Sequence, residues 1–353
     1  MTGAETTAAQ ASGRTHQDIA RRRAGAHATA GAALMVVTLF GAPAVLSTYW
    51  LDVLTEVSVY TIVCLGLGVL IGRVGLVSLC QAAILGLGAW ISARLLFATS
   101  LPFALVLLIA GGGTALLGTL LGLPALRLSG LYLALITLML AGAVTVVLTN
   151  TQFPNGGPGF LAHTDATTGS AIRRPDLARS DPGYFRYAVI VTAMLALLAL
   201  AHVRSKPGRA WAAIRQSEPA AIAAGVNITL YKLWALALAS FVTGVAGGLL
   251  AGDVGHLYVV QFPAIANILL LAAILMGGVY SLWGAVVAGM LMKLLPALLD
   301  NWGLPADLLT ILFGVGILQV LLTAPGGLAA QVPRDLARLH RSIVGRTVGR
   351  NAG

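Results

Sequence analysis

Uncharged polar side chains lie within the long apolar runs of this chain, where hydrogen-bonding groups are scarce, and four of them are Ser78, Gln81, Tyr132 and Thr137. Hydroxyl and amide groups can hydrogen-bond a small polar solute without the cost of burying a charge. We therefore interpret these four residues as candidates for the lining of a translocation path. The alternative is that they satisfy backbone groups and permit close helix packing, as Ser and Thr often do within membranes.

Ionisable side chains are almost absent from the interior of the same runs. Lys293 is the exception. Its long side chain either extends from its helix toward water, which we favour, or faces a central cavity and contacts an anionic group. A proton-driven carrier needs titratable groups within the membrane, so that class is disfavoured. The chain also lacks the G-x-x-x-x-G-K-[ST] phosphate loop. We infer that the chain binds no cofactor of its own and that a separate ATPase supplies the energy.

The stretch 204–232 is the one long cationic segment between two apolar runs. Its charged residues are Arg204, Lys206, Arg209, Arg215 and Lys232, against the single acid Glu218. Pro and Gly at 207–208 end the preceding helix, and a first short helix is expected at about 209–216. Ser217 is then a candidate N-cap of a second short helix, which Gly225 ends. Thr229 is the expected cap of the next apolar helix.

A helical wheel over this stretch places Trp211, Ile214, Glu218 and Ile222 on one face, which the break at Ser217 bends. An acid beside an apolar stripe is a candidate docking surface for a partner protein. The alternative is that the cationic stretch only fixes the orientation of the chain in the membrane.

Enzymatic and metal-binding chemistry find no support in the residue pattern. An intramembrane hydrolase would need a His near Ser78, but His163, His202 and His256 fall in loops or at run ends. Cys64 and Cys80 lie within apolar runs, with neither a disulfide framework nor metal-ligand spacing. The sequence therefore predicts no catalytic site and no metal site.

Composition indicates a polytopic membrane protein. Of 353 residues, 58% are hydrophobic and only 10% are charged. The net charge of +10 would suggest nucleic acid binding in a soluble protein. Here the basic residues gather at the ends of apolar runs, which membrane orientation explains better, and no nucleic acid partner is expected.

The fold class that follows is an all-α, transmembrane helical bundle of about ten spans. The apolar runs fall at about 31–51, 54–72, 76–97, 101–124, 128–149, 185–203, 233–252, 264–282, 284–299 and 305–323. Runs 76–97, 264–282 and 284–299 are interrupted by Gly, so broken or re-entrant helices are expected there. Residues 75–79 and 278–282 are also weakly similar to each other, which indicates either an internal repeat or chance.

The distribution of Lys and Arg predicts that both termini are cytoplasmic. Residues 1–30 are then a disordered cytoplasmic tail, 31–330 the transmembrane domain, and 331–353 a basic cytoplasmic tail. Within the domain, 204–232 lies on the cytoplasmic side and 150–184 forms a long outer loop.

Several segments together resemble one family, the permease subunits of ABC importers for branched-chain amino acids, which also includes urea and short-amide permeases. They are GLVSLCQAA at 75–83, RLSGLYLALITL at 127–138, the pattern from Gly208 to Lys232, Gly277-Gly278 with SLWG at 281–284, and PGGL at 325–328. The resemblance covers about residues 35–330. Cys80 stands where the family usually has Gly and Gln81 where it has His, which leaves the solute open.

The resemblance implies a bacterial inner-membrane permease that pairs with a second permease, two ATPases that hydrolyse ATP, and an extracytoplasmic solute-binding protein. The cytoplasmic loop would couple to the ATPase through Arg215, Glu218, Ala220, Ala221 and Gly225. The expected solute is a branched-chain or related amino acid. The alternatives are a urea or short-amide permease of the same family, and an ATP-independent solute channel.

Overall fold

The computed structural model describes residues 38–126, 128, 130–150, 172, 174–175, 178–258, 261–305, 307–323, 327–329 and 331. The predicted tail 1–30, nearly all of 331–353, and residues 151–171 of the predicted outer loop lie outside this part of the chain. The chain divides into two compact units, Met1–Leu51 and Asp52–Gly353. In the first unit, residues 38–45 are helical. The contacts discussed below all lie within the second.

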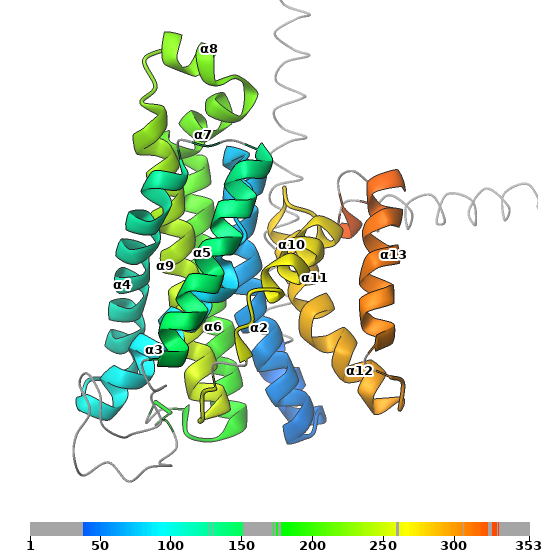
Figure 1. Cartoon of the computed structure of the whole chain (residues 1–353). Helices are drawn as coiled ribbons and strands as arrows, with labels where there is room; N and C mark the ends of the chain where they lie inside the picture. Colours follow the sequence, from blue (N-terminus) through cyan, green and yellow to red (C-terminus); the bar gives the residue numbers. More distant parts are fainter. Residues whose placement is uncertain are drawn as a thin grey trace, which may run out of the picture. The chain divides into compact units, whose positions relative to one another are not determined.

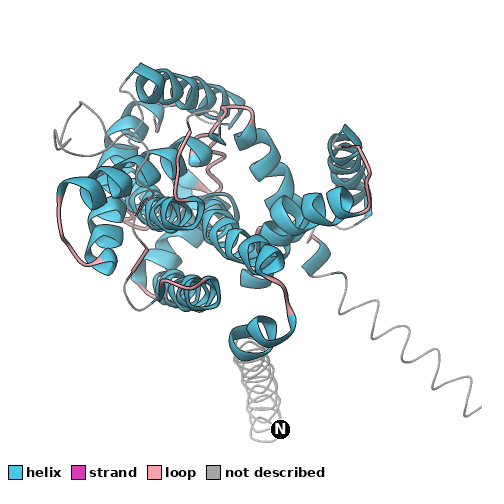
Figure 2. Ribbon diagram, turned by 90° about the horizontal axis from the view of Figure 1, so that it is seen from below, coloured by secondary structure: helices cyan, strands magenta, loops and turns pink. Residues whose placement is uncertain are grey.

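Helices account for all the regular structure of the described residues (Figure 2). In chain order they are α2 (Thr48–Gly68), the π-helix η1 (Val69–Val74), α3 (Gln81–Ala98), α4 (Phe103–Ala125), α5 (Gly130–Asn150), α6 (Asp181–Arg204), α7 (Lys206–Gln216), α8 (Glu218–Ala223), α9 (Ile228–Val254), α10 (Ala266–Gly277), α11 (Leu282–Gly289), the π-helix η4 (Met290–Leu294), α12 (Leu295–Asn301) and α13 (Asp307–Thr323). The all-helical fold predicted from the sequence is confirmed for these residues.

Among the described residues, seven helical segments are long and apolar enough to cross a membrane. They are Thr48–Val74, Gln81–Ala98, Phe103–Pro124, Gly130–Asn150, Asp181–Arg204, Ile228–Val254 and Leu282–Asn301. The predicted run 264–282 contains only the 12-residue helix α10, and the run 305–323 contains the 17-residue α13. The chain is therefore a multi-pass membrane protein, and the number of ten spans is not confirmed.

The centre of the second unit is the packing of α9 against α3 and α4 (Figure 1). Small residues bring these backbones together. A Cβ atom on Gly247 of α9 would overlap the carbonyl oxygen of Leu85 on α3, and one on Gly88 would overlap the carbonyl oxygen of Gly244. Close approach at small residues is how helices associate in membranes, where lipid removes the hydrophobic driving force between them.

Two non-helical breaks interrupt the bundle, and the second touches the π-helix that precedes the first. Residues 75–80 separate η1 from α3, and residues 278–281 separate α10 from α11. Each break begins at a glycine in the left-handed region, Gly75 with φ 83° and Gly278 with φ 117°. A Cβ atom on Gly72 of η1 would overlap the carbonyl oxygen of Val279, so the second break is in backbone contact with the π-helix that directly precedes the first.

Candidate functional site

The segment between α6 and α9 folds as the two short helices that the sequence predicts (Figure 1). The Ser217 hydroxyl accepts a hydrogen bond from the Ala220 backbone N–H at 3.4 Å and caps α8. Gly225 has φ 78° and follows the end of α8, where its N–H donates to the Ile222 carbonyl at 2.9 Å. The predicted cap at Thr229 is wrong: Asn227 caps α9 by accepting from the Leu230 N–H at 3.1 Å.

The structure divides the predicted docking face. Trp211 and Ile214 are buried within this chain, and the Trp211 indole N–H donates to the Tyr231 carbonyl at 2.8 Å. These two side chains therefore anchor α7 and are not free to meet a partner. Ile222 of α8, in contrast, is 63% exposed. The exposed apolar surface of this segment is thus displaced from α7 to α8.

The remaining predicted coupling residues fall into two groups. Ala221 is buried, while Ala220 and Gly225 are exposed on the surface of α8 and its end. The Glu218 carboxylate lies 2.6 Å from the Lys232 ammonium, whose side chain is only 8% exposed. Glu218 consequently serves first to hold α8 against the start of α9, and half of its side chain stays accessible.

Arg215 ties α7 to η1 and to the second break in the bundle. Its guanidinium donates to the Gly72 carbonyl at 2.8 Å and to the Tyr280 hydroxyl at 2.8 Å. The guanidinium carbon also lies 4.6 Å from the centroid of the Tyr280 ring. From the other side, Arg73 donates to the Tyr280 carbonyl at 3.0 Å. A displacement of α7 would therefore reach η1 and the 278–281 break through one side chain.

Arg215→Gln and Tyr280→Ala are expected to destabilise the permease by less together than the sum of the two separate effects. Each change alone removes the same guanidinium–tyrosine contact, so the coupling energy should be about 0.5–3 kcal/mol. The measurement is unfolding of the purified permease in detergent for the two single variants and the double variant. Arg209→Gln, at an exposed position of the same helix, is the matched control and should show additivity with Tyr280→Ala.

Three of the four predicted path residues gather where the first break enters α3. Thr137 of α5 accepts a hydrogen bond from the Leu79 backbone N–H at 2.9 Å and donates to the Ala134 carbonyl at 2.9 Å. The Ser78 hydroxyl lies 3.1 Å from the Cys80 sulfur. Thr137 thus satisfies the unpaired backbone of the break, as the structural alternative predicted. Tyr132 is 72% exposed and has no place in this group.

Gln81, the first residue of α3, is the buried polar centre of the group. Its side-chain carbonyl accepts a hydrogen bond from the Thr243 hydroxyl of α9 at 2.7 Å, and its amide nitrogen has no hydrogen-bond partner among the described residues. The next residue, Ala82, donates its N–H to the Asn267 side chain of α10 at 2.7 Å. Sequence reasoning missed Thr243 and Asn267, although each is a polar residue within an apolar run.

A pocket adjoins this group between α3, α4, α5 and α9. Its walls include Cys80, Gly118, Thr137 and Ser240. The Ser240 hydroxyl is buried and has no hydrogen-bond partner in the part of the chain that the structure describes. Polar groups left without partners in an apolar wall are costly, so a solute that supplied hydrogen bonds would be favoured there. Among the described residues, no group of three His, Cys, Asp or Glu side chains is placed to hold a metal ion.

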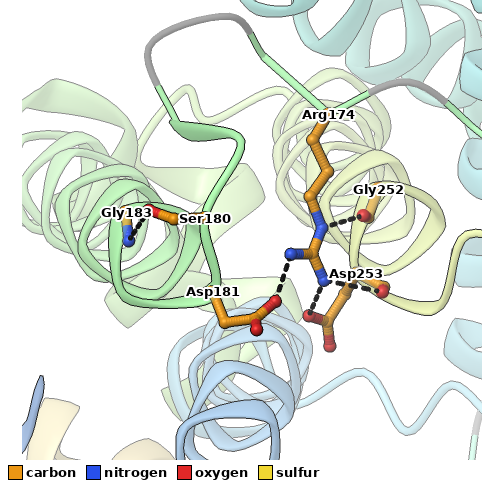
Figure 3. A network of polar contacts seen from close by, with 6 residues as sticks. All are labelled: Arg174, Ser180, Asp181, Gly183, Gly252 and Asp253. Carbon is orange, nitrogen blue, oxygen red and sulfur yellow. Dashed lines mark hydrogen bonds and ion pairs between the residues drawn. The ribbon is translucent and has the colours of Figure 1, made fainter. Parts of the chain in front are cut away.

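A second polar network lies at the C-terminal end of α9 (Figure 3). Arg174 lies between two carboxylates: its guanidinium is 2.5 Å from Asp181 at the start of α6 and 4.0 Å from Asp253 near the end of α9. It also donates to the Gly252 carbonyl at 3.1 Å. Partial burial lowers the pKa of Arg174, but the hydrogen bond and charge of Asp181 outweigh it, and the pKa lies above its usual value.

The Glu218–Lys232 ion pair and the network around Arg174 lie at opposite ends of α9. Lys232 is in the first turns of α9 and Asp253 in its last, a separation of about 30 Å at the rise of an α-helix. That distance matches the thickness of the hydrocarbon core of a bilayer. The segment containing α7 and α8 therefore lies at the other end of α9 from the residues that close the predicted outer loop.

The expected extension of Lys293 toward water is wrong. Its ammonium forms an ion pair with the Glu56 carboxylate of α2 at 2.8 Å and lies 4.7 Å from the centroid of the Tyr60 ring. Glu56 is only the third residue of the predicted run 54–72. Helix α2 begins at Thr48, which carries Glu56 two turns into the span.

Comparison with known proteins agrees with this architecture. Residues 49–321 match a family model described as "Branched-chain amino acid transport system / permease component". Two curated relatives, from Salmonella typhimurium and Escherichia coli, are each described as "High-affinity branched-chain amino acid transport system permease protein LivM". The first is 30% identical over 279 residues, which are 74% of this chain and 65% of the relative. The second is 30% identical over 269 residues, which are 71% of this chain and 63% of the relative. This chain thus spans less than two thirds of either relative, and no solved structure matches it.

Proposed function

Because the chain belongs to the branched-chain amino acid transport permease family, we propose that it is the transmembrane subunit of an ATP-driven importer for branched-chain or related amino acids. The single observation that carries the ATP-driven part is the segment containing α7 and α8. It is capped, anchored through Trp211 and Glu218, and presents the exposed Ile222. A channel that worked without ATP would have no need of such a segment.

The complex that follows contains this chain, a second permease, two ATPase subunits and an extracytoplasmic solute-binding protein in the bacterial plasma membrane. The chain lies with both termini and residues 204–232 in the cytoplasm and with 150–184 outside. ATP is hydrolysed by the partner subunits, and this chain holds neither an ATPase site nor a cofactor. The name of the curated relatives and the positive-inside distribution of Lys and Arg support this arrangement.

Coupling begins at α8. Ala220, Ile222 and Gly225 enter a cleft on the ATPase, and Glu218 and Ala221 hold α8 in place for that contact. When ATP draws the two ATPase subunits together, α7 moves with α8. Arg215 then transmits the displacement to the Gly72 carbonyl in η1, just before the first break, and to Tyr280 in the second. Discontinuous helices form the substrate sites of many transporters, around which one part of the bundle rocks against the other.

Solute passes beside the entrance to α3. Gln81 and Ser78 supply hydrogen-bonding groups there, and Thr137 keeps the backbone of the break satisfied. Tyr132, which is exposed on α5, contributes to the path only if the second permease covers it.

In proteoliposomes containing the full complex, leucine uptake is expected to require ATP hydrolysis. The measurement compares uptake with ATP and with a non-hydrolysable ATP analogue, in the presence of the solute-binding protein. Uptake that persisted at the same rate with the analogue would contradict the proposal and establish the ATP-independent channel instead. Liposomes that hold this permease without the ATPase subunits are the control, and they should show no leucine uptake.

A further inference from the structure

A salt bridge lies inside the candidate spans, where charge is expensive. Glu56 of α2 and Lys293 of η4 are 2.8 Å apart, and the lysine ammonium also faces the ring of Tyr60. Ionisable side chains within transmembrane segments are rare, usually paired, and typically mark the route of a substrate or ion. A pair of this kind gives little net stability, because the desolvation of both charges offsets their attraction. Stability alone therefore does not account for it.

The pair is not enclosed by tight packing. Both side chains are 28% exposed, in contrast to the 8% of Lys232 in the salt bridge at the other end of the bundle. None of the five residues of η4 is buried. Single π-helical turns within longer helices are often found at functional sites. The two charges are therefore partly accessible and not sealed within packed protein.

The charge around the pair is asymmetric. Asp52 lies one turn before Glu56 on the same helix. Asp253 at the end of α9 interacts electrostatically with Asp52, Glu56, Asp181 and Arg174. The acids thus gather on the side of Glu56 toward Asp52, while Lys293 lies on the side of Tyr60. This arrangement favours a positive group next to Glu56 and leaves Lys293 as the nearest cation for a negative group.

We propose that Glu56 and Lys293 bind the two ends of a zwitterionic amino acid during its passage. The solute ammonium takes the place of Lys293 at Glu56, and the solute carboxylate takes the place of Glu56 at Lys293. One ion pair is exchanged for two, so no unpaired charge is left in a low-dielectric site. Without solute, the two residues neutralise each other. The inference rests on the proposed function of amino acid import, and it disfavours uncharged solutes such as urea, which cannot replace either charge.

The test removes or swaps the two charges and measures leucine uptake by the complete complex in proteoliposomes. Glu56→Gln and Lys293→Met should each lower uptake at limiting leucine about tenfold or more, since each removes one charge-assisted contact. The variant with Glu56→Lys and Lys293→Glu keeps an ion pair between the helices but reverses its direction. Its uptake should stay as low, because the solute carboxylate would then face Asp52 and Asp253. Met290→Leu, an exposed neighbour in η4, is the matched control and should transport normally.

A readout without transport separates binding from folding. Leucine should raise the melting temperature of the detergent-purified wild-type complex, prepared without the solute-binding protein, and should not raise that of the exchanged variant. The double variant Glu56→Gln with Lys293→Met has no unpaired charge and should assemble to the wild-type level while failing to transport leucine.

Two results would count against the ion-pair site, and one would count against both proposals. Wild-type uptake by the exchanged variant, or by the double neutral variant, would show that the pair only joins two helices. No uptake and no leucine-dependent melting shift in the wild-type complex would overturn the proposed function together with the site.

Discussion

Ile222→Arg is expected to separate the permease from its ATPase and to abolish leucine uptake. Ile222 is 63% exposed on the six-residue helix α8, and we propose that it fills an apolar pocket on the partner. A charge at the centre of such an interface costs about 3 kcal/mol, which is roughly 100-fold in affinity. The measurement is co-purification of the ATPase with a tagged permease from membranes, followed by uptake in proteoliposomes.

Position 222 is a cleaner test than position 218. Glu218 is paired with the buried ammonium of Lys232, so Glu218→Arg would place two cations together and disturb the segment itself. Ile222→Leu, which keeps the size and the apolar character, should retain both the ATPase and transport. Co-purification and uptake at wild-type levels in Ile222→Arg would remove α8 from the coupling interface.

Gly247→Leu is expected to eliminate most of the folded permease. The backbone of α9 touches that of α3 at this position, and even a Cβ atom would overlap the carbonyl oxygen of Leu85. Overpacking of a close contact costs about 1–3 kcal/mol or more, and a whole domain is stable by only about 5–15 kcal/mol. The amount of monodisperse protein extracted in mild detergent, and its melting temperature, report the result.

Gly112→Leu provides the matched comparison. Gly112 also lies within a long apolar helix, α4, but a Cβ atom there would meet nothing within 4 Å. This variant should be extracted at close to the wild-type level. Equal yields of the two variants would show that the contact between α3 and α9 is not what holds the bundle together.

The features predicted well from the sequence are those encoded by neighbouring residues. The cap at Ser217 and the end of α8 at Gly225 each depend on a few positions, so both were found. The cap of α9 was placed two residues late. Asn227 and Thr229 are both good cap residues, and only the packing of α9 selects between them.

Contacts between distant parts of the chain could not be predicted in this way. Glu56 and Lys293 are far apart in sequence, and no local pattern indicates that the fold places them side by side. Likewise, Arg215 reads as a surface charge until the fold places Tyr280 beside it. The sequence singled out Ser78, Gln81, Tyr132 and Thr137 as candidates for the path only by their polarity. It could not predict that Tyr132 lies exposed and apart from the other three, because exposure depends on how α5 packs.

The glycine contacts of α9 also limit which parts of the molecule can change shape. Where backbone meets backbone, there are no rotamers to exchange and no side chains to interdigitate in a different way. We therefore expect α3 and α9 to move together as one rigid body in any change of shape. Bending should fall instead on interrupted stretches of backbone, such as those that begin at Gly75 and Gly278.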